Sequence, residues 1–114
     1  MSFKEVKDKN IALVTGATGG LGTAMCQKLL DDGFFVVANY RNEETAARWH
    51  EKNLELGYDC AMVKGDVTSF DEVGAMVRSI KEQYGSVAVL INNAGITRDT
   101  PIWKMQLNQW LDVI

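Results

Sequence analysis

Residues 15–22 read T-G-A-T-G-G-L-G and decide the fold. A short apolar run at residues 11–14 precedes them and a helix-like pattern follows, so the segment predicts a strand, a loop and a helix in that order. Gly16, Gly20 and Gly22 permit a tight turn, a close approach of a pyrophosphate to bare backbone, and close packing of the helix on the strand. The free N–H groups and the positive dipole end of that helix then predict a phosphate-binding loop.

Short apolar runs, typical of parallel strands covered on both faces, alternate with helical patterns along the chain. This alternation predicts right-handed crossovers and an α/β fold, the first half of a Rossmann-type doubly wound parallel sheet with strand order 3-2-1-4. The Ser69-x-x-Glu72 spacing predicts a capping box at the start of the third helix. We also expect a further helix after Pro101. The expected strands are residues 11–14, 34–38, 60–63 and 87–91, and the expected helices are about 20–32, 43–56 and 69–84.

Length and charge restrict the class of protein. The 114 residues allow one domain at most. A net charge of -3 without a basic cluster argues against nucleic acid as a partner. The longest uncharged apolar stretch, residues 87–96, is far shorter than the roughly 20 residues that span a bilayer, so no membrane segment is expected. Residues 1–9 are polar and charged, unlike a signal peptide.

The potentially reactive Cys and His side chains are interpreted as structural. Cys26 and Cys60 have neither C-x-x-C spacing nor His or Cys neighbours in the sequence, which predicts two reduced, packed thiols and a cytoplasmic location. His50 has no nucleophile or metal ligand at helical spacing and is predicted to be solvated. No metal site is expected.

Three motifs together resemble the short-chain dehydrogenase/reductase family: the T-G-x-x-x-G-x-G loop, the pair Asp66-Val67, and N-N-A-G at residues 92–95. The resemblance covers the N-terminal half of such a protein. It implies that residues 1–114 form an NAD(P)-binding Rossmann half-domain and that the catalytic half, with the family's Ser, Tyr and Lys, is absent. No catalytic residue is therefore expected within this segment, which alone should be inactive.

The resemblance also implies where the cofactor binds. Asp66 would contact the adenine amine, Val67 would contact the ring, and small residues after the fourth strand would adjoin the ribose. For Asn92, a structural tie between neighbouring strands is an equal alternative. The implied cofactor-binding residues are Gly16, Thr18, Gly19, Gly20, Leu21, Gly22, Asn39, Tyr40, Arg41, Gly65, Asp66, Val67, Asn93, Ala94, Gly95 and Thr97.

The end of the second strand selects the nicotinamide cofactor. Asn39 occupies the position where we expect NAD-specific relatives to carry an Asp, and Arg41 can pair bidentately with a 2′-phosphate. NADPH is therefore favoured over NADH. In the alternative interpretation, Arg41 is a surface side chain paired with Glu43 or Glu44. Gly19 is a departure, because many NADP-linked relatives carry Arg or Lys there.

Residues 96–99, I-T-R-D, resemble a segment of bacterial reductases that act on 3-oxoacyl thioesters of coenzyme A or of acyl carrier protein. The resemblance implies NADPH-dependent reduction, most simply of acetoacetyl-CoA to 3-hydroxybutanoyl-CoA, as in polyhydroxybutyrate synthesis. Asp99 would touch the substrate, or would instead cap a helix or pair with Arg98. The first alternative is the acyl-carrier-protein reductase of fatty acid synthesis. The second is a non-catalytic dinucleotide-binding or self-associating fragment.

Self-association is expected in either case. A homo-oligomer is predicted for the reductase, and Trp103 and Trp110, seven residues apart, would lie on one side of a packing or subunit-contact helix. The fourth strand, residues 87–92, would end the segment with an unpaired edge. Because such edges associate readily, the isolated 114 residues are predicted to associate or aggregate.

Overall fold

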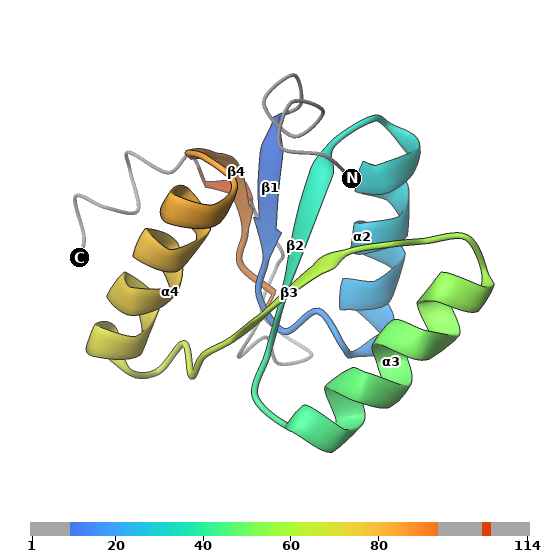
Figure 1. The fold of residues 1–114 in the computed structure, drawn as a ribbon, viewed down its shortest axis with the longest axis horizontal. Coiled ribbons are helices and arrows are strands. Elements are labelled where there is room, and N and C mark those ends of the chain that lie inside the picture. Colours follow the sequence, from blue (N-terminus) through green and yellow to red (C-terminus); the bar gives the residue numbers. More distant parts are fainter. Residues whose placement is uncertain (1–9, 94–103, 106–114) are drawn as a thin grey trace.

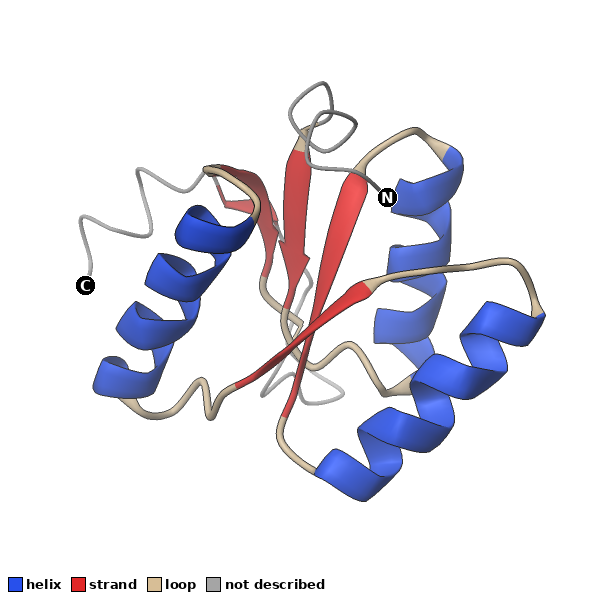
Figure 2. Ribbon diagram, in the orientation of Figure 1, coloured by secondary structure: helices blue, strands red, loops and turns tan. Residues whose placement is uncertain are grey.

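The computed structural model describes residues 10–93 and 104–105, which contain five strands and three helices (Figures 1 and 2). The described elements follow the predicted order, with an additional short strand at the end. They are β1 (Ile11–Val14), α2 (Gly20–Asp31), β2 (Phe35–Tyr40), α3 (Glu43–Glu55), β3 (Ala61–Lys64), α4 (Phe70–Gln83), β4 (Val87–Ile91) and β5 (Lys104–Met105).

The sheet has the order β3-β2-β1-β4-β5, and its first four strands are parallel. The predicted order 3-2-1-4 is thus confirmed. β1 lies between its two neighbours, with Val14 in register with Ala38 of β2 and Ile91 of β4. Because the strands are parallel, the carboxyl ends of β1 to β4 meet at one edge of the sheet.

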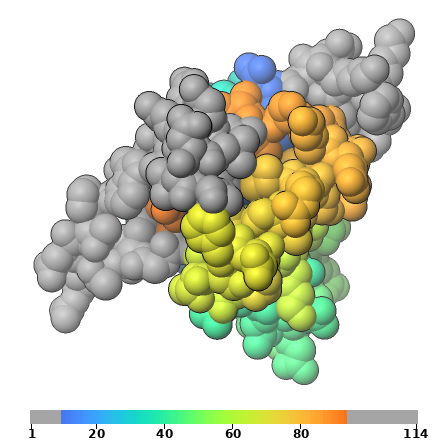
Figure 3. Space-filling view, turned by 90° about the vertical axis from the view of Figure 1, so that its left-hand side faces the viewer, coloured from blue at the N-terminus to red at the C-terminus, as the bar shows by residue number. Residues whose placement is uncertain are grey.

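Side chains of β1 alternate between two apolar layers. Ala12 and Val14 pack in a cluster that includes Trp49 of α3, whereas Ile11 and Leu13 pack in a cluster that includes Ile80 of α4. Figure 1 shows α2 and α3 together on one side of the sheet and α4 on the other. Figure 3 shows α4, in yellow and orange, at the surface of its side. Both faces of the central strands are covered, as their uninterrupted apolar runs predicted.

The helix starts agree with the sequence, with one change in the capping box. The Ser69 hydroxyl accepts a hydrogen bond from the Glu72 N–H at 3.3 Å, as predicted. The Glu72 carboxylate, however, accepts from the N–H of Asp66 at 3.2 Å instead of returning to Ser69. Glu72 therefore connects the start of α4 to the loop that follows β3.

The chain beyond β4 differs from the sequence prediction. Residues 104–105, expected in a helix after Pro101, form β5, which pairs antiparallel with Leu90 and Ile91. The predicted fully unpaired edge of β4 is therefore wrong. The physical reason is that the free N–H and C=O groups of an edge strand bind an extended segment. Pro101, Trp103 and Trp110 lie outside the described residues.

The two cysteines are free and buried, as predicted, but they are not isolated from each other. Both belong to the core cluster beneath α2 and α3. The pKa of Cys26 is raised, mainly by a thiol–thiol hydrogen bond with Cys60 and secondly by burial.

The His50 ring lies 3.4 Å from the Asp59 carboxylate. Among the described residues, no His, Cys, Asp and Glu cluster could hold a metal, and no helix has the length and apolarity needed to cross a membrane.

Candidate functional site

The turn after β1 is held at one residue, Gly16, by two asparagine side chains. Gly16 adopts a φ of 60°, a left-handed conformation that favours glycine. Its N–H donates to Asn39 Oδ1 at 3.3 Å, and its carbonyl accepts from Asn93 Nδ2 at 2.9 Å. The chain leaving β1 is therefore fixed from the ends of both neighbouring strands.

Thr15 strengthens the connection between β1 and β4. Its N–H donates to the Ile91 carbonyl at 3.0 Å, and its buried hydroxyl donates to Asn92 Oδ1 at 3.1 Å. The same hydroxyl oxygen accepts from the Asn93 N–H at 2.9 Å. Asn92 thus makes the structural tie between strands that was one of its two predicted roles.

The start of α2 is open to an anion. Gly19 is the N-cap and supplies no side-chain hydrogen bond, and the first turn contains no acidic residue. In contrast, Asn42 caps α3 and Ser69 caps α4, and both of those helices begin with acidic side chains. Because carboxylates near a helix N-terminus compete with a bound anion, α2 is the described helix whose N-terminus suits a phosphate. Gly19, Gly20 and Leu21 are exposed there.

Gly22 brings α2 against the turn that precedes it. A Cβ at this position would lie 2.5 Å from the Gly16 carbonyl oxygen and 2.8 Å from two backbone atoms of Ala17. Since backbone atoms cannot move aside cheaply, only glycine fits, which accounts for the close packing predicted from the sequence. Gly20, in contrast, faces open space.

Asn39, which the sequence predicts to be a cofactor-binding residue, is only 1% exposed. Its Nδ2 donates to the Gly65 carbonyl at 3.1 Å, while its Oδ1 accepts from Gly16. The side chain therefore bridges two loops beneath the site surface.

Arg41 and Asp66 form an ion pair across the ends of β2 and β3. Arg41 Nη2 lies 3.4 Å from Asp66 Oδ2, and the Arg41 side chain is 71% exposed. Among the described ion pairs, Arg41 is not paired with Glu43 or Glu44, and Glu43 contacts Lys64 Nζ at 3.1 Å. A pocket of about 190 Å³ lies at this point, lined by Arg41, Lys64, Gly65, Asp66 and Glu72.

The Asp66 carboxylate is stabilised in its ionised form. The Thr68 hydroxyl and N–H donate to Asp66 Oδ1 at 2.7 and 2.9 Å. These bonds lower the pKa of Asp66, loss of hydration opposes them, and the Arg41 charge lowers the pKa further. Thr68 was not among the residues predicted from the sequence, although Asp followed two residues later by Thr is a known local hydrogen-bonding pattern.

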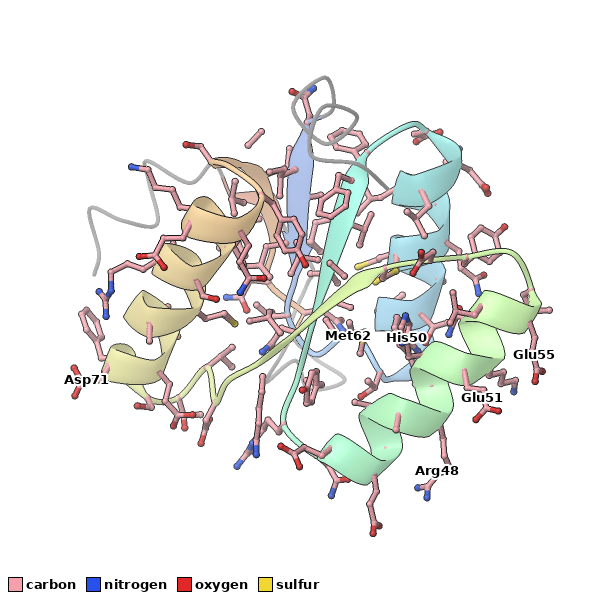
Figure 4. The ribbon with its side chains drawn as sticks, in the orientation of Figure 1. Arg48, His50, Glu51, Glu55, Met62 and Asp71 are labelled. Carbon is pink, nitrogen blue, oxygen red and sulfur yellow. The ribbon has the colours of Figure 1, made fainter. Side chains whose placement is uncertain are left out.

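Tyr40 lines a second pocket, of about 160 Å³, between α3 and β3. Figure 4 shows His50 of α3 and Met62 of β3, which line it as well. Thr18 adjoins the glycine turn and Val67 follows Asp66, both partly buried. The predicted residues Ala94, Gly95, Thr97 and Asp99 lie outside the described residues.

A glycine turn, an open helix N-terminus and a charged pocket thus share the carboxyl edge of a parallel sheet, next to the strands where the order changes direction. This combination defines a doubly wound nucleotide-binding fold. The chain belongs to the short-chain dehydrogenase family, whose model matches residues 10–114, and members of this family bind NAD(P).

Proteins similar in sequence to this chain include two named as reductases and one named nodulation protein G. The chain is 47% identical to acetoacetyl-CoA reductase of Allochromatium vinosum over 106 residues, covering 91% of the chain and 43% of the relative. It is 50% identical to nodulation protein G of Azospirillum brasilense over 107 residues, covering 93% and 44%. Identity is 40% to a 3-oxoacyl-[acyl-carrier-protein] reductase of Staphylococcus aureus, covering 90% and 42%. The chain therefore spans less than half the length of these relatives.

Solved structures agree with the fold. A variant of actinorhodin polyketide ketoreductase with NADPH matches at a TM-score of 0.71 and 35% identity, covering 94% of this chain and 41% of that one. The structure of gox2181 matches at a TM-score of 0.72 and 32% identity, covering 97% and 44%.

Replacing Gly22 tests the packing of α2 on the turn. We expect Gly22→Ala to lower the free energy of unfolding by about 1–3 kcal/mol, because its Cβ would collide with fixed backbone. Gly20→Ala is the matched control and should be neutral or stabilising by up to about 1 kcal/mol, since alanine favours the helix. Urea unfolding of both variants measures the difference. Equal effects at the two positions would contradict the close packing.

Removing the Thr68 hydroxyl tests how Asp66 stays ionised. We expect Thr68→Val to raise the pKa of Asp66 part of the way toward 3.8, because the backbone N–H bond remains. The stability that the lowered pKa contributes is present above 3.8 and is lost as the pH falls from there through the folded-state pKa, so in the variant this loss should be smaller and should end at a higher pH. A ¹³C NMR titration of the carboxyl carbon measures the shift, and an unchanged pKa would refute this assignment.

Proposed function

We propose that these residues form the cofactor-binding part of an NADPH-dependent reductase of 3-oxoacyl thioesters, with acetoacetyl-CoA as its substrate. The single observation that carries the proposal is the Gly16 turn, held by two asparagines in front of an uncapped helix. The names of the reductases among its relatives support the reaction type.

The described residues fit a dinucleotide at three points. The start of α2 would hold the pyrophosphate, because the residues that begin the helix are exposed and no carboxylate competes there for their free N–H groups. The ionised Asp66 would accept a hydrogen bond from the adenine amine. Bound NADPH would supply the hydride for reduction of the carbonyl. The proton donor for that reaction is proposed to come from residues outside this segment.

Arg41 supports NADPH rather than NADH. Its guanidinium is exposed and borders the pocket at the end of β3. It lies 3.4 Å from the Asp66 carboxylate, and a phosphate could compete with that carboxylate for the guanidinium. We propose that a 2′-phosphate takes the place of Asp66 as the partner of Arg41. This exchange would release Asp66 to contact adenine, so both contacts would form together.

The acyl carrier is the open choice within the proposal. The acetoacetyl-CoA reductase of A. vinosum, at 47% identity, favours coenzyme A. The S. aureus enzyme named for acyl carrier protein, at 40% identity, supports the alternative. A homo-oligomeric enzyme remains part of the proposal.

Replacing Arg41 tests the cofactor preference. We expect the full-length wild-type protein to prefer NADPH, and Arg41→Ala to lower kcat/KM for NADPH by about tenfold or more, the loss typical of a charged hydrogen bond, with little change for NADH. Arg48→Ala is the matched control, because Arg48 is exposed on α3 and points away from the sheet (Figure 4). An unchanged NADPH/NADH ratio would refute the role of Arg41, and a wild type preferring NADH would refute the cofactor proposal.

A substrate panel tests the reaction. The full-length protein should oxidise NADPH in the presence of acetoacetyl-CoA and form the 3-hydroxy product, which chromatography identifies. The panel also contains 3-oxoacyl thioesters of acyl carrier protein, a ketose and a steroid ketone. Faster turnover of the acyl-carrier-protein thioester would favour the alternative carrier, whereas turnover of the ketose or steroid alone would overturn the proposal.

A further inference from the structure

Asn39 has a buried polar side chain that makes hydrogen bonds to two loops. It is 1% exposed and its amide has one acceptor and two donor hydrogens. Asn39 Oδ1 accepts a hydrogen bond from the Gly16 N–H at 3.3 Å. Asn39 Nδ2 lies 3.1 Å from the Gly65 carbonyl and 3.3 Å from Met76 Sδ. A side chain so placed faces the protein interior and not the proposed cofactor.

The backbone around Asn39 makes the same connection. The Asn39 carbonyl accepts from the Ala17 N–H at 3.1 Å, and the Tyr40 carbonyl accepts from the Gly65 N–H at 3.0 Å. Two adjacent residues of β2 therefore bind the turn after β1 on one side and the turn after β3 on the other. A Cβ at Gly65 would lie 3.7 Å from Asn39 Nδ2 and 3.2 Å from Met76 Sδ, so the turn sits directly on these side chains.

We propose that Asn39 is a positioning residue that sets the spacing between the phosphate loop, residues 15–22, and the adenine loop, residues 65–69, without touching the dinucleotide. The inference rests on the proposed cofactor function. A dinucleotide spans both loops, so its affinity depends on their relative placement, whereas Asn39 lies beneath them. NADP⁺ and NAD⁺ share the pyrophosphate and adenine and therefore depend on Asn39 equally.

The amide is chemically specific at this place. Alanine would leave the Gly16 N–H and the Gly65 carbonyl without their partner, which is costly for buried polar groups. Aspartate would keep the acceptor for Gly16, but its charged second oxygen would face the Gly65 and Val63 carbonyls. A protonated aspartic acid would restore a donor to Gly65. Asn39→Ala thus removes the hydrogen bonds to both loops, whereas ionised Asn39→Asp removes only the one to Gly65.

Equilibrium binding of NADP⁺ and NAD⁺ to the full-length protein tests the inference. We expect Asn39→Ala to weaken both dinucleotides by about tenfold, with the ratio of their dissociation constants unchanged. The matched control is Asn53→Ala, because Asn53 is also buried and hydrogen-bonded, to Gln27 and the Trp49 carbonyl, but lies in α3 away from both loops. Asn53→Ala should lower the unfolding temperature and leave both affinities unchanged.

Asn39→Asp supplies a readout that a loss of stability would not move. We expect it to bind NAD⁺ weakly at about pH 8 and to recover toward the wild-type affinity at about pH 5, because protonation restores the donor to Gly65. NAD⁺ is the probe here because it lacks a titrating 2′-phosphate, and wild type is measured at each pH. This variant also serves as the second test if Asn39→Ala does not fold.

The outcomes separate the inference from the proposed function. Wild-type protein that binds neither dinucleotide would overturn the proposed function and the inference with it. Wild-type binding with unchanged affinities in both Asn39 variants would overturn the inference alone. A changed NADP⁺/NAD⁺ ratio in Asn39→Ala would show direct contact with the ribose instead, and equal weakening by Asn53→Ala would show a general loss of structure. Either result would also overturn it.

Discussion

The left-handed turn at Gly16 is the constraint on which the rest of this site depends. Asn39 accepts from the Gly16 N–H and Asn93 donates to the Gly16 carbonyl, so the ends of β2 and β4 both determine where the chain leaves β1. That direction places the start of α2 over the carboxyl edge of the sheet, and Gly22 then packs on the Gly16 carbonyl, where a Cβ would not fit. The exposed N-terminus of α2 follows from these contacts.

Charge is distributed to match this geometry. The helices α3 and α4 begin with capping side chains and carboxylates, whereas α2 begins with glycine and no acid. At the pocket beside β3, the Asp66 carboxylate instead forms an ion pair with Arg41 and accepts a hydrogen bond from Thr68. These contacts hold the polar groups in place before a ligand arrives, which reduces the ordering that binding requires.

Much of this arrangement was predictable from the sequence, because local signals carried it. The alternating runs gave the strand order, and the glycine spacing predicted the close packing at Gly22. The inward direction of Asn39 and the Arg41–Asp66 pair were not predictable, since both depend on how β2 and β3 are placed side by side. The antiparallel β5 was missed because an edge strand can pair with a segment whose own sequence pattern suggests a helix.

A crystal structure of the full-length protein with bound NADP⁺ tests the central claim most directly. We expect the pyrophosphate at the start of α2, the 2′-phosphate at Arg41, and Asn39 still bonded to Gly16 and Gly65 beneath the cofactor. An Asn39 side chain turned outward to the ribose, or a dinucleotide bound away from the Gly16 turn, would contradict it.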